Sequence, residues 1–177
     1  MTRGIALFLA VFLAAAASAE ARVSDRVLGL LDGCRTALIS GDEEAFEGLD
    51  LETEMTSDAL IIRGWRGPEE AGLTVSLMVR ERADGRAGVC DISYLPKAGD
   101  KGAAAELRSM ALSLSQTLKE APGTVVTQKQ AGEVLTTCRG DRDLSLFIDP
   151  ESLGVGFAAQ LAMGPRKETR NATQGCM

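Results

Sequence analysis

The chain has 177 residues, of which 45% are hydrophobic and 25% charged, and its formal net charge is −6 with no histidine. This length suits a single domain with its own hydrophobic core. The acidic balance argues against nucleic acid and anionic membrane surfaces as partners, because both bind a basic face. Without histidine the sequence also lacks the base of the usual Ser-His and Cys-His catalytic pairs.

Residues 1–19 predict a cleavable secretory signal peptide. Arg3 supplies a positive charge, residues 4–16 form an apolar run, and Ala-Ser-Ala at 17–19 places small residues where a signal peptidase reads them. The apolar run is shorter than the roughly 20 residues of a membrane-spanning helix. We therefore expect residues 20–177 to form a single globular domain, periplasmic or secreted, with no membrane insertion after cleavage.

The mature chain is expected to begin with an amphipathic helix over about residues 24–39. Its apolar residues recur at helical spacing: Val27, Leu30, Leu31, Cys34, Ala37 and Leu38. Ser24 can cap the start of this helix, and Ser40 with Glu43 fits the capping box of a short second helix. Residues 49–60 read as a loop.

A short strand at about 59–66 and a hairpin at 72–95 follow. Asp-Gly at 84–85 is a strong two-residue turn signal. Pairing around it places Val79 opposite Cys90, Leu77 opposite Ile92 and Val75 opposite Tyr94, all on one apolar face.

Beyond the hairpin, the pattern predicts a helix at about 103–119 and strands at about 124–129, 132–138 and 143–149. A final strand over about 153–163 alternates between large and small residues. Its small-residue side consists of Gly154, Gly156, Ala158, Gln160 and Ala162. Small residues let another chain approach closely, so this side is a candidate partner surface. A polar C-terminal tail begins at about residue 165.

All four cysteines, Cys34, Cys90, Cys138 and Cys176, follow the predicted cleavage site. An even number in an exported chain favours two structural disulfides. No C-x-x-C motif is present and the wide spacings match no common zinc site, so we expect no metal and no cofactor. Because the first helix and the hairpin each carry a cysteine on an apolar face, docking them favours the pairs Cys34–Cys90 and Cys138–Cys176.

The order of the elements predicts an α+β fold, α-β-β-β-α-β-β-β-β, in which two main helices pack on an antiparallel sheet of about five to seven strands, stapled by two disulfides. The order also fits a loose duplication of a helix followed by a meander, although no residue-level repeat supports it.

Two clusters are candidate binding features. Arg63, Trp65 and Arg66 place two guanidinium groups around the only tryptophan, an arrangement that can hold a sugar or an anion. Residues 42–54 are acidic, but the alternating acids and central glycine of a calcium-binding EF-hand loop are missing. A solvated loop is the favoured interpretation of this stretch.

We expect an exported, non-enzymatic accessory protein that binds another protein. The Ala- and Gly-rich composition, with more Arg than Lys, favours a bacterial periplasmic protein. Two alternatives remain open: a small-ligand module for anions or sugars at Arg63, Trp65 and Arg66, and a hydrolase with a carboxylate or Ser-Lys site, which no motif selects.

Overall fold

A computed structural model of the chain describes residues 22–68, 72–81, 83, 85–129, 131–139 and 141–165. The predicted signal peptide and the polar C-terminal tail lie outside these residues, so both stay predictions. Within the described part, no helix is long and apolar enough to cross a membrane.

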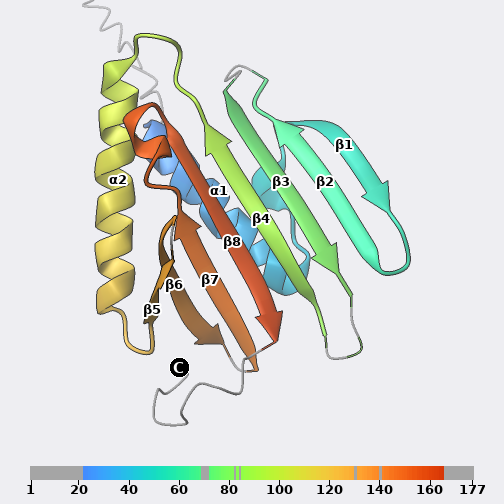
Figure 1. Cartoon of the computed structure of the whole chain (residues 1–177). Helices are drawn as coiled ribbons and strands as arrows, with labels where there is room; N and C mark the ends of the chain where they lie inside the picture. The colour runs from blue at the N-terminus through green and yellow to red at the C-terminus, as the bar shows by residue number, and fades with distance from the viewer. Residues whose placement is uncertain are drawn as a thin grey trace, which may run out of the picture.

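The described residues form two helices and eight strands (Figure 1). In chain order they are α1 (Val23–Ser40), β1 (Asp50–Thr56), β2 (Leu60–Arg66), β3 (Leu73–Arg80), β4 (Ala87–Tyr94), α2 (Lys101–Glu120), β5 (Val125–Lys129), β6 (Gly132–Arg139), β7 (Arg142–Ile148) and β8 (Phe157–Pro165). Two 3-10 turns, η1 (Glu44–Phe46) and η2 (Ser152–Gly154), precede β1 and β8. The α+β class with two helices is confirmed, but the expected five to seven strands were too few.

The eight strands form one antiparallel sheet in the order β1-β2-β3-β4-β8-β7-β6-β5. Each half of the chain is therefore a meander, and the two halves meet where β4 pairs with β8. The strand order is symmetric about this pair, and each meander follows a helix. At the level of elements, the fold thus agrees with the loose duplication suggested by the sequence.

The additional strand is β1, in the stretch that was expected to be a loop. All seven of its residues are exposed, and three of them are acidic. The strand is held by its pairing with β2 rather than by burial. Its two apolar residues, Leu51 and Met55, alternate with acidic residues, but two apolar side chains are too few to predict a strand.

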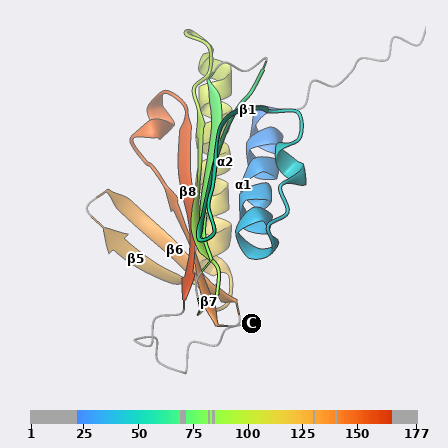
Figure 2. The same cartoon turned by 90° about the vertical axis from the view of Figure 1, so that its right-hand side faces the viewer.

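Both helices pack on the same face of the sheet (Figure 2). The core between them contains α1 residues Val27, Leu30, Cys34, Ala37 and Leu38 and β3 residues Leu73, Val75, Leu77 and Val79. Gly88 of β4 lies beneath α1, and a Cβ there would come within 2.9 Å of the Leu38 side chain. The missing side chain allows the helix to lie close to the strand.

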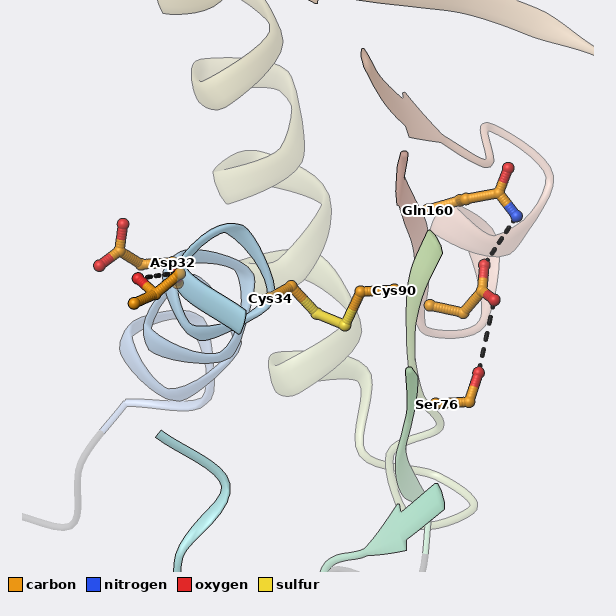
Figure 3. The surroundings of a disulfide bond; sticks show 7 residues. Asp32, Cys34, Ser76, Cys90 and Gln160 are labelled. Atoms are coloured by element: carbon orange, nitrogen blue, oxygen red, sulfur yellow. Dashed lines mark hydrogen bonds between the residues drawn. A yellow bond between two sulfur atoms is a disulfide. The ribbon is translucent and has the colours of Figure 1, made fainter. Parts of the chain in front are cut away.

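A disulfide joins α1 to β4, from Cys34 to Cys90, with the two Cα atoms 5.6 Å apart (Figure 3). Both cysteines are almost completely buried. This bond confirms the favoured first pairing, and it is the one disulfide whose two ends both lie in the described residues. Cys176 lies outside them, so the predicted Cys138–Cys176 bond, and with it the count of two disulfides, stays a prediction.

The hairpin of β3 and β4 differs in register from the prediction. Cys90 pairs with Leu77 rather than with Val79, and the other two predicted pairs are shifted in the same way, so that Ile92 faces Val75 and Tyr94 faces Leu73. β3 ends at Arg80 and β4 begins at Ala87, so the connection between them is longer than a two-residue turn. A shift of two residues leaves every side chain on its expected face, because side chains alternate with a period of two.

The two helices are joined near their first turns. The backbone N–H and the hydroxyl of Ser24 donate hydrogen bonds to Glu106 Oε1 of α2, at 3.0 and 2.5 Å. Ser24 was expected to cap α1, but it lies inside the helix, whose N-cap is Arg22. The carboxylate of Glu106 accepts an N–H that the first turn of a helix leaves unpaired.

Replacing both bridged cysteines (Cys34→Ala with Cys90→Ala) should lower the free energy of unfolding by about 2–5 kcal/mol. The bond closes a loop with a sequence separation of 56, which restricts the unfolded chain. Urea unfolding of the oxidised protein and the double variant measures the difference. A non-reducing peptide map that joins Cys34 to another cysteine would contradict the structure.

The hydrogen bonds from Ser24 of α1 to Glu106 of α2 should make the free energy of unfolding depend on pH. Hydrogen bonds from the Ser24 hydroxyl and then its backbone N–H lower the pKa of Glu106 from its ordinary 4.5. A carboxylate with a lowered pKa stabilises the folded chain above pH 4.5, and this stabilisation is lost as the pH falls through the lowered value. Glu106→Gln should therefore reduce Tm at neutral pH and have progressively less effect in acid. A reduction in Tm that is equal at every pH would count against this role.

Candidate functional site

The two faces of the sheet have different surroundings. Side chains alternate along each strand, so one set faces the helices and the other faces away. In Figure 2 both helices lie on one side, and no described helix covers the other. We call this second side the open face. On β8 it carries Ala158, Gln160 and Ala162, three members of the small-residue side that the sequence marked as a partner surface.

Gly154 and Gly156, the other two members of that side, do not lie on the strand. Gly154 ends η2, and Gly156 precedes β8. A Cβ on Gly156 would come within 2.3 Å of the Tyr94 carbonyl oxygen. Gly156 is therefore small because a neighbouring strand passes close to it.

A row of aliphatic side chains crosses the open face. Successive strand pairs place Met55 opposite Ile62, Ile62 opposite Met78, Met78 opposite Val89 and Val89 opposite Ala162. We call these five residues the aliphatic row. Met55 is 57% exposed and Met78 is 41% exposed. Exposed apolar side chains gathered in this way are typical of an interaction surface.

The aliphatic row leads into a groove of about 950 Å³ on the open face, bounded by β3, β4, β8, β7, β6 and β5. In Figure 2, β5 and β6 turn away from the helices and so form one wall. The floor continues the row with Ser145 and Thr136, whose hydroxyl oxygens lie 2.9 Å apart. The floor is therefore aliphatic on β3, β4 and β8 and carries hydroxyl groups on β7 and β6, while Val125 and Val134 add aliphatic side chains to the far wall.

Two cations line this groove, Arg80 of β3 and Lys129 of β5. Neither has a carboxylate within ion-pair distance among the described residues. Asp143 of β7 also lines the groove, so the charged lining consists of two cations and one carboxylate, a local excess of positive charge in an acidic chain. It favours an occupant that carries a carboxylate.

A polar row borders the aliphatic row. Asp91 accepts hydrogen bonds from Gln160 at 2.8 Å and from Ser76 at 3.4 Å (Figure 3). These three side chains hold one another across β8, β4 and β3. They form a hydrogen-bonded polar border along one side of the aliphatic row.

Of the three predicted binding residues, the structure brings two together. Arg63 and Trp65 lie on the helix face of β2, whereas Arg66 points to the opposite face and pairs with Glu52 at 2.7 Å. Trp65 is 7% exposed, and its ring lies 4.7 Å from that of Phe46 in η1. The tryptophan thus anchors the 3-10 turn to the sheet.

Arg63 is engaged by two carboxylates of the acidic stretch. Its Nη1 lies 2.5 Å from Glu43, and its Nε donates to Glu54 at 3.1 Å. The hydrogen bond to Glu43 is the main cause of the raised pKa of Arg63. Several of the acids between residues 42 and 54 therefore have partners within the fold, which the interpretation as a solvated loop did not include.

The described residues contain no cluster of three or more Cys, Asp or Glu side chains arranged to hold a metal ion. Comparisons with protein-family models, with curated proteins and with solved structures found no match to this chain. Its function must therefore be inferred from its own surfaces.

The ion pairs of Arg63 and Arg66 should differ in strength. Arg63→Met is expected to lower the free energy of unfolding by about 1–2 kcal/mol, because it removes charged hydrogen bonds to partly buried Glu43. Arg66→Met is the matched control on the same strand. Its pair with Glu52 is about half exposed, so the loss should stay below about 1 kcal/mol. Urea unfolding followed by Trp65 fluorescence measures both, and equal losses would contradict this ranking.

Proposed function

We propose that this protein is an exported, non-enzymatic accessory protein, bacterial and periplasmic, which binds another protein through the open face of its sheet. The observation that carries the proposal is the aliphatic row running into the groove on a face that no described helix covers. Met55 and Met78 of this row are exposed and the other three side chains are half-buried. They lose hydration when a partner covers them, and this favours association.

The groove also indicates what the partner presents. Aliphatic side chains of the partner would contact Met78, Val89 and Ala162. A polar group placed there would lose its hydrogen bonds to water without gaining others, whereas an apolar group would not. A carboxylate of the partner would lie near Arg80 and Lys129. The partner segment is therefore apolar with at least one acidic residue.

The C-terminal tail belongs to the same proposal. We infer that Cys138 is bonded to Cys176, the pairing favoured by the sequence. Cys138 is not a free thiol, and it lies opposite Asp143, a residue of the groove. A bond at this position would anchor the tail beside the proposed binding surface.

Site-specific photo-crosslinking in the cells that make the protein tests the proposal. A photoreactive amino acid at Met78 should give a discrete protein adduct. The same amino acid at Leu112, which is 58% exposed on α2, is the matched control and should give none. Absence of an adduct at Met78, Val89 and Ala162, or equal yields at Leu112, would refute the proposal.

A substitution in the groove provides the second half of the test. Ala162→Arg places a long charged side chain at the groove end of the aliphatic row, next to Val89, and should abolish the adduct formed from Met78. Ala105→Arg, on an exposed turn of α2, should leave it unchanged. Urea unfolding of both variants establishes that they are folded. An adduct that survives Ala162→Arg would place the partner elsewhere.

A further inference from the structure

A second apolar site lies on the helix side of the sheet, in the space between α1 and α2. The helices meet where Ser24 bonds to Glu106, and from there α1 runs away from α2 behind the sheet (Figure 1). The space that opens between them holds a pocket of about 300 Å³. This volume is near the lower end of the range for small-molecule sites, about 300–1,000 Å³.

We call this space the leucine pocket, because every apolar side chain that lines it is a leucine. Leu28 and Leu31 of α1 form one wall, Leu114 and Leu118 of α2 form the other, and the floor consists of leucines of β6, β7 and β8, Leu135 and Leu161 among them. Leu28 is 38% exposed, so the pocket opens to the surface beside it.

The polar groups around the leucine pocket already have partners inside the fold. Thr137 donates its hydroxyl hydrogen to the Leu144 carbonyl oxygen at 3.5 Å. At the rim, Arg35 and Asp32 form an ion pair at 2.7 Å. The interior therefore offers no polar group to orient a polar ligand, and an occupant must be recognised by apolar area alone. A flexible aliphatic chain fits a space walled by branched aliphatic side chains.

The rim supplies the only charge that such a chain would meet. Arg35 lines the pocket, and its side chain is 41% exposed. Its partner Asp32 is 67% exposed, and an ion pair this exposed is weak. Arg35 can therefore turn part of its guanidinium toward an anionic group at the mouth. Asp32 lines the same rim, so a ligand carboxylate would share the guanidinium of Arg35 with it. This combination of an apolar interior and an exposed guanidinium at the mouth matches an acyl chain that ends in a carboxylate.

We propose that the leucine pocket binds the acyl chain of a free fatty acid, with its carboxylate at Arg35. The proposal does not depend on the open face or its partner. The alkyl chain replaces water along the leucines, while the head group remains at the surface. Affinity should then follow chain length, by about fourfold for each added methylene, until the pocket is full.

Isothermal titration calorimetry of the purified, oxidised protein tests this, using saturated fatty acids of increasing length below their critical micelle concentrations. The expected result is a dissociation constant that falls about fourfold per methylene and then reaches a plateau. No binding across the series, or binding that does not depend on chain length, would overturn the proposal.

Two tryptophan substitutions on α2 locate the site. Leu118→Trp should fill the leucine pocket and reduce affinity at least tenfold. Leu112→Trp, on the exposed side of the same helix, should have no effect. Leu114→Trp replaces Leu118→Trp if the latter fails to unfold cooperatively. Binding that survives the pocket substitutions but is lost in Ala162→Arg would assign the fatty acid to the open face and overturn the proposal.

The head-group contact has its own test, which leaves the core intact. Arg35→Gln should weaken binding of the fatty acid by up to about fivefold, the range of an exposed ion pair. It should leave binding of the alcohol of equal chain length unchanged. Equal effects on the two ligands, or no effect on either, would show that Arg35 does not hold the carboxylate and would overturn that assignment.

Discussion

The packing of α1 across the pair of strands β4 and β8 is the contact on which the remainder of the structure depends. These strands are the only ones through which the two meanders are hydrogen-bonded within the described sheet, and α1 contacts both. The Cys34–Cys90 bond makes the contact with β4 covalent, whereas the contact with β8 is held by apolar burial. One helix thus fixes the first half of the chain directly and joins the second half to it.

The number of helices explains where binding surfaces remain. Eight strands spaced at about 4.8 Å span roughly 34 Å, whereas two helices of about 10 Å each cover roughly 20 Å. α1 lies over the centre and diverges from α2, so apolar surface is left between them as the leucine pocket. At the outer edge, β1 has no helix above it and is exposed on every residue. The opposite face has no described helix at all, which leaves the aliphatic row and its groove in contact with solvent.

The parts of the fold that the sequence predicted are those with a strong periodic pattern. Both helices, the hairpin face and the Cys34–Cys90 bond follow from apolar spacing. β1 was missed because its stability comes from pairing and from contacts such as Glu54 with Arg63, which no periodicity records. The aliphatic row across the open face could not be predicted from the sequence either, because it depends on the register of five strands. Only its end on β8, where Ala162 belongs to the series of small residues, left a signal in the sequence.

The position of β4 at the centre of the sheet has a consequence for the order in which the chain folds. The chain is synthesised from its N-terminus, and α1, β1–β4 and both bridged cysteines precede Leu95. This first half contains the whole of the Cys34–Cys90 bond, but one edge of β4 has no partner until Phe157–Pro165 pairs with it. An apolar edge strand pairs readily with another chain, and contacts so distant in sequence form slowly. Until β8 pairs with β4 in its own chain, the free edge of β4 can instead pair with β8 of a second molecule. Two molecules can then exchange their C-terminal halves.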